Sequence, residues 1–330
     1  MSERDTRIGI TTTVPVEVIF AAGLVPVDLN NAFISDPDPL SLVVEAEEAG
    51  LPRNACAWIK GIYSACLRSG ITRLAGVVQG DCSSTRALLE ILERAGVDTV
   101  DFAYPIRRSP KAMLASLRSL AASLGTTLTS AEDVRQALRA PRALLSELHE
   151  LARDGRVTGA EAHEWMVSSS DFRGDWRTYT RELEAFLGAA RDRPVPPPRP
   201  AVMLAGVPPI VADLFDVAEG LGIRIAENEV PSEFTLYPWR DMHLQDIYCN
   251  YSYPYDSAFR LIRLRQRIDA SSIRGVIHYQ QSFCHRQISA VLLKGSLPVP
   301  VLALECDRPG PMDGAARTRL EGFVEMLRAV

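Results

Sequence analysis

The chain lacks the sequence features of several large functional classes. No stretch approaches the roughly eighteen consecutive apolar residues of a membrane-spanning helix, so we expect no membrane association. Acidic residues outnumber basic ones by 41 to 36 and no basic stripe is present, which argues against nucleic-acid binding. There is neither a G-x-x-x-x-G-K-[ST] loop nor a G-x-G-x-x-G turn after a predicted strand, so we predict no nucleotide site.

Cysteine is scarce and never closely spaced. The 330 residues contain six cysteines in two triplets, Cys56, Cys66 and Cys82 and then Cys249, Cys284 and Cys306. Their spacings, C-x9-C-x15-C and C-x34-C-x21-C, lack the close CxxC-type pairs typical of zinc sites. The polar N-terminus MSERDTRIGI predicts no signal peptide and therefore a cytoplasmic protein. In that compartment thiols are free for metals or catalysis.

Length and composition predict two compact units of the α/β class. With 47% hydrophobic residues, the chain can bury more than one core. In 1–110 and again in 199–330, short apolar strands alternate with helices, which predicts right-handed βαβ units and a parallel sheet in each part. We therefore expect two flavodoxin- or Rossmann-like domains. The expected strands are 7–11, 24–29, 74–79, 99–104, 201–204, 223–226, 275–279 and 299–304.

Residues 111–198 differ, because they read as helices without strands. The proline- and charge-rich stretch RDRPVPPPRP at 191–200 predicts a semi-rigid connector. In the second α/β part we expect an irregular region that extends through Pro254. The expected helices are 14–22, 54–69, 84–95, 110–124, 131–153, 160–167, 209–220, 257–270, 285–294 and 314–329.

The two α/β parts look like copies of one another. IGITTTVPVEVIFAAGLVPVDLN parallels VMLAGVPPIVADLFDVAEGLGIRIAEN, and LAGVVQGDCSSTRALLEILERAG parallels RGVIHYQQSFCHRQISAVLLKGS. In the second pair a cysteine, Cys82 or Cys284, stands just beyond a buried strand and just before a helix. Any two doubly wound sheets share part of this pattern, so chance similarity is an alternative. The matched cysteines favour duplication.

The cysteine count and positions suggest an iron–sulfur site. Three thiolates are too few for a closed four-ligand metal site, but they suit a cubane whose fourth iron is bridged or open to a substrate. Ligands of open α/β sheets bind outside the carboxyl ends of the strands, where Cys82, Cys284 and Cys306 are expected. Helices follow Cys82 and Cys284, and N–H groups at a helix start lower the pKa of a thiol and hydrogen-bond its sulfur.

The other three cysteines carry less information. Cys56 falls at the start of a predicted helix and Cys66 later on it, about 15 Å away if that helix is straight. Cys249 falls in the irregular segment YCNYSY. A small buried apolar residue is among the commonest roles of a free cysteine, and it remains an alternative for each of the six.

The residues around these cysteines resemble a known family. The opening GITTTVPVEVIFAAGLVPVDL and the strand ends G-D-C (80–82) and S-F-C-H (282–285) are similar to the 2-hydroxyacyl-CoA dehydratase/benzoyl-CoA reductase superfamily. The resemblance covers nearly the whole chain, including the helical middle and the connector. In the dehydratase subunits of that family, three cysteines hold one [4Fe–4S] cluster whose fourth iron is open to substrate. Cys56, Cys82 and Cys284 match those positions.

The additional Cys66, Cys249 and Cys306 make the chain most similar to the double-cubane cluster proteins. In that branch two [4Fe–4S] units share a bridging sulfide as [8Fe–9S]. The resemblance implies that all six cysteines hold this cluster in the cleft between the two sheet domains. It also implies a homodimeric iron–sulfur oxidoreductase, which takes low-potential electrons from an ATP-hydrolysing iron–sulfur reductase and reduces a small molecule. Which three cysteines hold each cubane stays open.

Two other functions stay open. One is a 2-hydroxyacyl-CoA dehydratase subunit with a single [4Fe–4S] cluster, usually paired with a different homologous subunit, in which the extra cysteines are incidental. The other is a non-catalytic electron-transfer or cluster-carrying protein.

Several further residues are candidates near the same strand ends. Reduction consumes protons, and His285 is the first candidate for a catalytic proton donor; hydrogen bonding to a sulfur is its alternative. We expect a tyrosine-rich segment, 248–255, to shield the cluster. The cations at 107, 108 and 111 either meet a phosphate or are solvated. The remaining polar candidates are His278, Gln79, Gln280, Gln281, Asp81 and Glu305.

Overall fold

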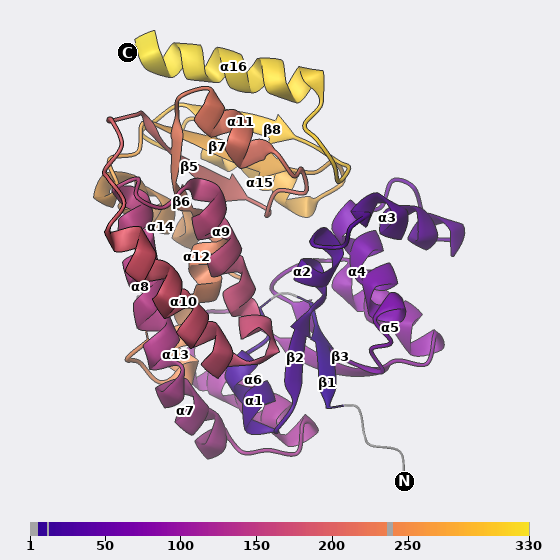
Figure 1. The fold of residues 1–330 in the computed structure, drawn as a ribbon. Coiled ribbons are helices and arrows are strands. Elements are labelled where there is room, and N and C mark those ends of the chain that lie inside the picture. The colour runs from indigo at the N-terminus through magenta and orange to yellow at the C-terminus, as the bar shows by residue number, and fades with distance from the viewer. Residues whose placement is uncertain (1–5, 12, 236–239, 330) are drawn as a thin grey trace.

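The computed structural model describes residues 6–11, 13–235 and 240–329, and it contains two parallel β-sheets with helices packed around them (Figure 1). The strand order is β2-β1-β3-β4 in the first sheet and β6-β5-β7-β8 in the second, and all neighbouring strands are parallel. This confirms the predicted α/β class with two parallel-sheet domains. The strands are β1 (Arg7–Ile10), β2 (Val25–Asp28), β3 (Arg73–Gln79), β4 (Asp98–Ala103), β5 (Ala201–Gly206), β6 (Arg224–Asn228), β7 (Gly275–Gln280) and β8 (Val301–Glu305).

The two sheets share one strand order, so β1 to β4 correspond in sequence and position to β5 to β8. This correspondence agrees with the repeat seen in the sequence. Strands β5 and β7 are buried along their whole length. Helices cover both faces of such central strands, and this explains their apolar runs without alternation.

Among the described residues up to position 109 there are five helices, and two of them, α2 and α3, were not predicted. Both have ordinary N-cap signals that the sequence reading missed. Asp28 accepts a hydrogen bond from the Asn30 N–H group at the start of α2, and Asp38 accepts one from Ser41 at the start of α3. The five helices are α1 (Val16–Ala21), α2 (Leu29–Ile34), α3 (Pro39–Glu48), α4 (Ala57–Arg68) and α5 (Thr85–Arg94).

The helical middle contains α6 (Pro110–Ser123), α7 (Leu128–Ala137), α8 (Arg139–Arg153), α9 (Gly159–Val167) and α10 (Trp176–Arg191). The single helix predicted at 131–153 is wrong, because α7 ends and α8 begins around Leu138. Pro141 has no N–H group to donate to the Ala137 carbonyl, so a continuous helix would lose a hydrogen bond there. Residues 192–200 have no helix or strand, as a connector requires.

The second α/β part has six helices among the described residues: α11 (Leu214–Gly220), α12 (Glu229–Thr235), α13 (Leu244–Asn250), α14 (Ser257–Ala270), α15 (His285–Leu293) and α16 (Gly314–Ala329). Two predictions were wrong here. Helix α11 begins at Leu214, because Val211 forms a bridge with Gly310 ahead of it. The region predicted to be irregular contains α12 and α13, and Cys249 lies on α13.

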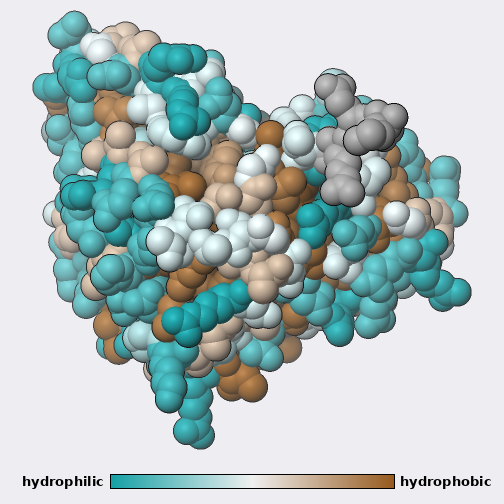
Figure 2. Space-filling view, turned by 90° about the horizontal axis from the view of Figure 1, so that it is seen from below, coloured by the Kyte–Doolittle hydropathy of each residue, from teal (hydrophilic) through white to brown (hydrophobic). Residues whose placement is uncertain are grey.

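Side chains of each sheet region pack in the core of the other. Leu244 and Tyr251 of the second part belong to the core around β1 and β3, whereas Phe33 and Ala57 of the first part pack in the core around β5 and β7. Seen from below, the molecule is hollowed between two lobes (Figure 2). Among the described residues, no helix has both the length and the apolar character needed to cross a membrane.

Candidate active site

A cavity of about 130 Å³ lies where the carboxyl ends of strands from both sheets face each other. Its lining includes Thr11 and Asp28, after β1 and at the end of β2, and Val207, after β5. Ligands of parallel sheets bind at this edge, and here two such edges contribute to one space. This cavity is therefore the candidate active site.

Three of the six cysteines line this cavity: Cys56, Cys82 and Cys284. Cys56 is the N-cap residue of α4, and Cys284 is the N-cap residue of α15. Cys82 lies in the turn between β3 and α5, and its sulfur accepts a hydrogen bond from the Ser84 N–H group at 3.4 Å. Two helix N-caps and one turn before a helix thus present thiols to one space, each beside backbone N–H groups that favour a thiolate.

The glycine at position 80 lets the chain make this turn into Cys82. Its φ of +100° lies in the left-handed region, which a side chain disfavours. A Cβ atom there would lie 2.7 Å from Cβ of Tyr104 and 3.0 Å from Cβ of Pro254. Glycine at this position therefore allows both the turn and the close packing behind Cys82.

Burial controls the protonation of these thiols. It raises the pKa of Cys56 to about 12; the first-turn N–H groups of Trp58 and Ile59 act in the opposite direction, and the nearby Cys284 and Cys82 add to the rise. Burial also raises the pKa of Cys82 and of Cys284. Without a cation the three groups are thus thiols, and a bound metal must displace their protons.

Gln281 and Arg286 connect the cysteines to their surroundings. The Cys56 thiol donates a hydrogen bond to Oε1 of Gln281 at 2.8 Å, which links α4 of the first part to the end of β7 in the second. Gln281 is 1% exposed, and its Nε2 has no hydrogen-bond partner among the described residues. The Arg286 guanidinium lies 3.5 Å from the centre of the Tyr253 ring, and both residues line the cavity.

The other three cysteines do not reach this cavity; each lies in a different apolar core. Cys66, with no exposed surface, packs among residues of α4, β3 and α5. Cys249 belongs to the core around β1 and β3, and Cys306 to the core around β5 and β7. Burial raises the pKa of Cys66 and of Cys306 to about 11. The expected convergence of six sulfurs therefore does not occur in this structure, because three thiols fill apolar packing positions.

The polar candidates at the strand ends have different positions. Asp81 lines the cavity. Gln79 donates through Nε2 to the Tyr104 carbonyl at 2.6 Å, and Glu305 accepts a bond from the Ser282 hydroxyl at 2.8 Å, so both hold the turns in place. His278 is buried in β7 outside the cavity, where burial lowers its pKa to about 4.

The remaining predicted residues contribute less. His285 begins α15, but its side chain lies outside the described part of the structure. Of the four tyrosines at 248–255, Tyr253 lines this cavity, while Tyr251 packs against Tyr104 in the core. Tyr253 and Tyr255 also line a second cavity, which reaches Cys82 from another side. The Arg108 guanidinium lies 3.8 Å from the centre of the Phe259 ring.

Sequence reasoning missed several residues that line the cavity. Asp28 is 2% exposed and accepts bonds from Asn30 and Ser170, and its N–H group donates to Asp171 at 2.8 Å. Burial raises the pKa of Asp171 to about 7, and the charge of Asp28 adds to this. The position of Asp28 at a strand end was a usable signal. His163, on α9 of the helical middle, gave none, because only the packing of α9 brings it to the cavity.

The donor set fits an iron–sulfur cluster better than a single metal ion. Among the described residues, no three His, Cys, Asp or Glu side chains are close enough to share one ion. Each thiolate of a cubane binds a different iron, so its ligands are spread around the cluster. Three thiols that precede three different helices around one cavity meet that requirement. The unpartnered Nε2 of Gln281 lies beside Cys56.

Comparison with known proteins identifies one family. A family model described as 2-hydroxyglutaryl-CoA dehydratase, D-component, matches residues 11–327, which is nearly the whole chain. No curated protein matches the chain.

Proposed function

The chain belongs to the 2-hydroxyglutaryl-CoA dehydratase D-component family, and we propose that it is the cluster-bearing component of a 2-hydroxyacyl-CoA dehydratase. Membership supports an iron–sulfur component of the dehydratase/benzoyl-CoA reductase type that works with an ATP-dependent activator. The proposal goes further in naming one [4Fe–4S] cluster held by Cys56, Cys82 and Cys284. The observation that carries it is the convergence of these three thiols, and of no other cysteine, on one cavity.

When bound, such a cluster supplies one-electron chemistry and an iron that is open to an oxygen atom of the substrate. The chain's own residues provide the surroundings. The helix starts at Cys56 and Cys284 supply N–H groups beside the sulfurs, and Ser84 donates to Cys82. Apolar side chains such as Ile59 and Val230 line the same cavity and limit water around a reactive intermediate.

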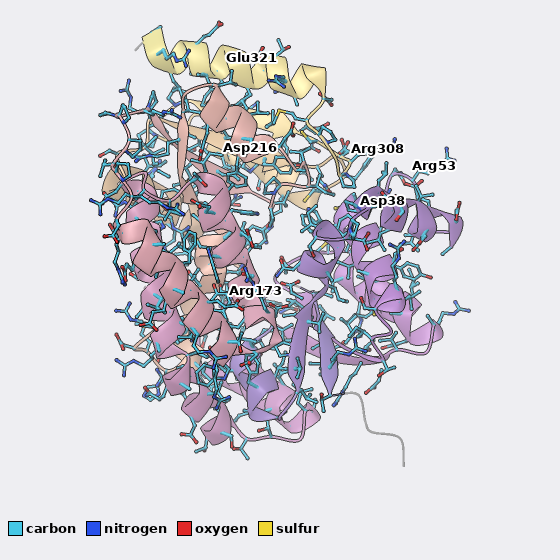
Figure 3. All side chains as sticks on the ribbon, in the orientation of Figure 1. Asp38, Arg53, Arg173, Asp216, Arg308 and Glu321 are labelled. Atoms are coloured by element: carbon cyan, nitrogen blue, oxygen red, sulfur yellow. The ribbon has the colours of Figure 1, made fainter. Side chains whose placement is uncertain are left out.

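Charges at the gap between the lobes suit a substrate with phosphate groups, as a CoA thioester has. Arg53 and Arg308 lie on facing sides of this gap (Figure 3). The positive charge of each helps to lower the pKa of the same carboxylate, Glu47, to which Lys60 contributes most. The Arg53 side chain is 94% exposed, and Arg308 is exposed as well. Guanidinium groups bind phosphates well, so these two are our candidates for contacts with the nucleotide part of CoA.

The double-cubane [8Fe–9S] reductase component remains a second candidate, because the chain has the six cysteines that it requires. It would require Cys66, Cys249 and Cys306 to leave three separate cores. Apolar burial of a cysteine stabilises the fold, so that rearrangement has a cost. The geometry therefore favours the single cluster.

Counting iron and sulfide on anaerobically purified protein separates these candidates. We expect about four irons per chain, whereas about eight would establish the double cubane and none would exclude both. Cys56→Ser, Cys82→Ser or Cys284→Ser should each lower the iron content. The matched controls Cys66→Ala, Cys249→Ser and Cys306→Ala should leave it unchanged, and a loss of iron in those variants would contradict the three-cysteine assignment.

Activity and assembly tests address the partners. With an ATP-hydrolysing activator, the protein should dehydrate a 2-hydroxyacyl-CoA. ATP-dependent reduction of a small molecule such as acetylene without dehydration would instead favour the double-cubane reductase. A non-catalytic electron carrier would show neither activity. We also propose that the chain forms a homodimer, which light scattering on the anaerobic protein would test; a monomer that pairs only with a different homologous subunit would contradict this.

A further inference from the structure

His163 lines the cavity from an unexpected direction. It lies on α9, in the helical middle, one helical turn before Val167, and both side chains border the same space. The helix thus presents an imidazole beside an apolar side chain toward the region where the three cysteines converge.

The proton of this imidazole has a defined position. Nδ2 of Asn228, at the end of β6, lies 2.8 Å from Nδ1 of His163. An amide NH₂ group only donates, so Nδ1 must accept and the ring proton must be on Nε2. Burial lowers the pKa of His163 to about 4, which keeps the ring neutral near pH 7. The Phe215 ring, 4.9 Å away between centroids, holds the imidazole plane in place.

The Nε2–H group is left for a bound molecule. Within the part of the chain that the structure describes, Nε2 has no hydrogen-bond partner. It is also not one of the fully buried polar atoms without a partner, so part of its surface is accessible. The ring borders the cavity, whose neighbouring walls include the apolar side chains of Ile34 and Val207. A fixed donor in an apolar cavity is the arrangement by which small-molecule sites orient a ligand.

We propose that His163 donates its Nε2–H group to an oxygen atom of the substrate's acyl group and so orients that group in the cavity. The acyl oxygens of a 2-hydroxyacyl thioester are the 2-hydroxyl and the carbonyl, and both accept hydrogen bonds. Asn228 and Phe215 are positioning residues in this arrangement. The inference rests on the proposed function, since it assumes that the cavity binds such a thioester.

Binding without turnover tests this inference. No activator or ATP is present, so the proposed dehydration does not proceed and calorimetry measures the Kd. The probe is 2-hydroxy-4-methylpentanoyl-CoA, chosen for the apolar walls. We expect His163→Leu to weaken binding about tenfold, equal to about 1.4 kcal/mol, and His163→Gln, which keeps an N–H donor, to stay within about threefold of wild type. Equal Kd values for wild type and His163→Leu would overturn the inference.

A second thioester identifies the oxygen. With 4-methylpentanoyl-CoA, which lacks the hydroxyl, the effect of His163→Leu should vanish if the hydroxyl is bound and persist if the carbonyl is bound; either result supports the donor role. His243→Leu, a substitution at a histidine whose side chain is 71% exposed, is the matched control and should leave Kd unchanged. A weakening of the same size in that control would also overturn the inference.

Two further measurements keep the outcomes distinct. The iron content and melting temperature of each variant show whether it is folded. If His163→Leu fails to fold, Asn228→Leu removes only the group that fixes the proton on Nε2, and we expect a smaller loss of affinity. Unchanged affinity in a folded Asn228→Leu would then overturn the inference. If wild type binds neither thioester, the proposed function itself fails and this inference with it.

Discussion

Loss of the buried ion pair between Glu229 and Arg260 should destabilise this fold strongly. Glu229 begins α12, directly before the cavity-lining Val230, and Arg260 lies on α14. The guanidinium makes two hydrogen bonds to the carboxylate, at 2.6 and 2.7 Å, and the side chains are 3% and 2% exposed. The carboxylate also accepts the Gly206 N–H group at the end of β5. One carboxylate therefore joins three elements behind the cavity wall.

The contribution of this ion pair to the free energy of unfolding follows from the pKa of Glu229. Burial alone would raise it, but the charge and hydrogen bonds of Arg260 outweigh burial and lower the pKa from 4.5 to about 2. A folded-state pKa below the unfolded value adds stability above pH 4.5, and this stability is lost as the pH falls toward 2. The difference corresponds to about 3 kcal/mol at pH 7, of which about 2 kcal/mol is lost by pH 3.

The assay is urea denaturation of wild type and Glu229→Gln, followed by circular dichroism at pH 7 and pH 3. At pH 7 we expect Glu229→Gln to lower the free energy of unfolding by about 3–5 kcal/mol, because Arg260 stays buried without its counter-charge. Glu229→Gln with Arg260→Met should recover part of this loss. The control Asp101→Asn breaks a pair whose side chains are about half exposed and should cost under about 1 kcal/mol.

Two results would refute this reasoning. One is a Glu229→Gln variant within about 1 kcal/mol of wild type at pH 7. The other is the same loss of stability between pH 7 and pH 3 in Glu229→Gln as in wild type, because the group assigned to that loss is absent from the variant.

Three further predictions concern the site and its support. Gly80→Ala should lower the iron content per chain after anaerobic purification, because its Cβ would displace the turn that carries Cys82. The control Gly188→Ala, where a Cβ meets nothing within 4 Å, should keep its iron. Equal iron content in the two variants would contradict this prediction. Gly61→Ala should cost about 1–3 kcal/mol in urea denaturation, because its Cβ would lie 2.3 Å from the Phe33 ring, and an unchanged midpoint would speak against it. Arg53→Gln combined with Arg308→Gln should raise the KM for a CoA thioester several-fold at low salt and less at high salt, without lowering kcat; a salt-independent effect would argue against phosphate contacts.

Much of the fold was predictable from the sequence, because its signals are local. Alternating apolar strands and helices predicted the two parallel sheets, and the strand order that the two sheets share agrees with the repeat. Helices α14 and α16 begin and end where the pattern placed them. The wrong predictions also concerned local signals. The apolar periodicity predicted one continuous helix where Pro141 requires two, and the N-caps of α2 and α3 were overlooked.

The site depends on contacts that no local pattern encodes. The sequence determined that Cys82 and Cys284 follow strand ends and that six thiols exist. The family resemblance grouped Cys56 with these two, but no local pattern does so. Only the tertiary structure shows that Cys56 lines the same cavity while Cys66, ten residues further along the chain, packs in a core. A helix has two faces, and packing chooses which one meets the cavity. For the same reason, only the packing of α9 beside β6 identifies His163 as a cavity residue, because its partner Asn228 lies 65 residues away in the sequence.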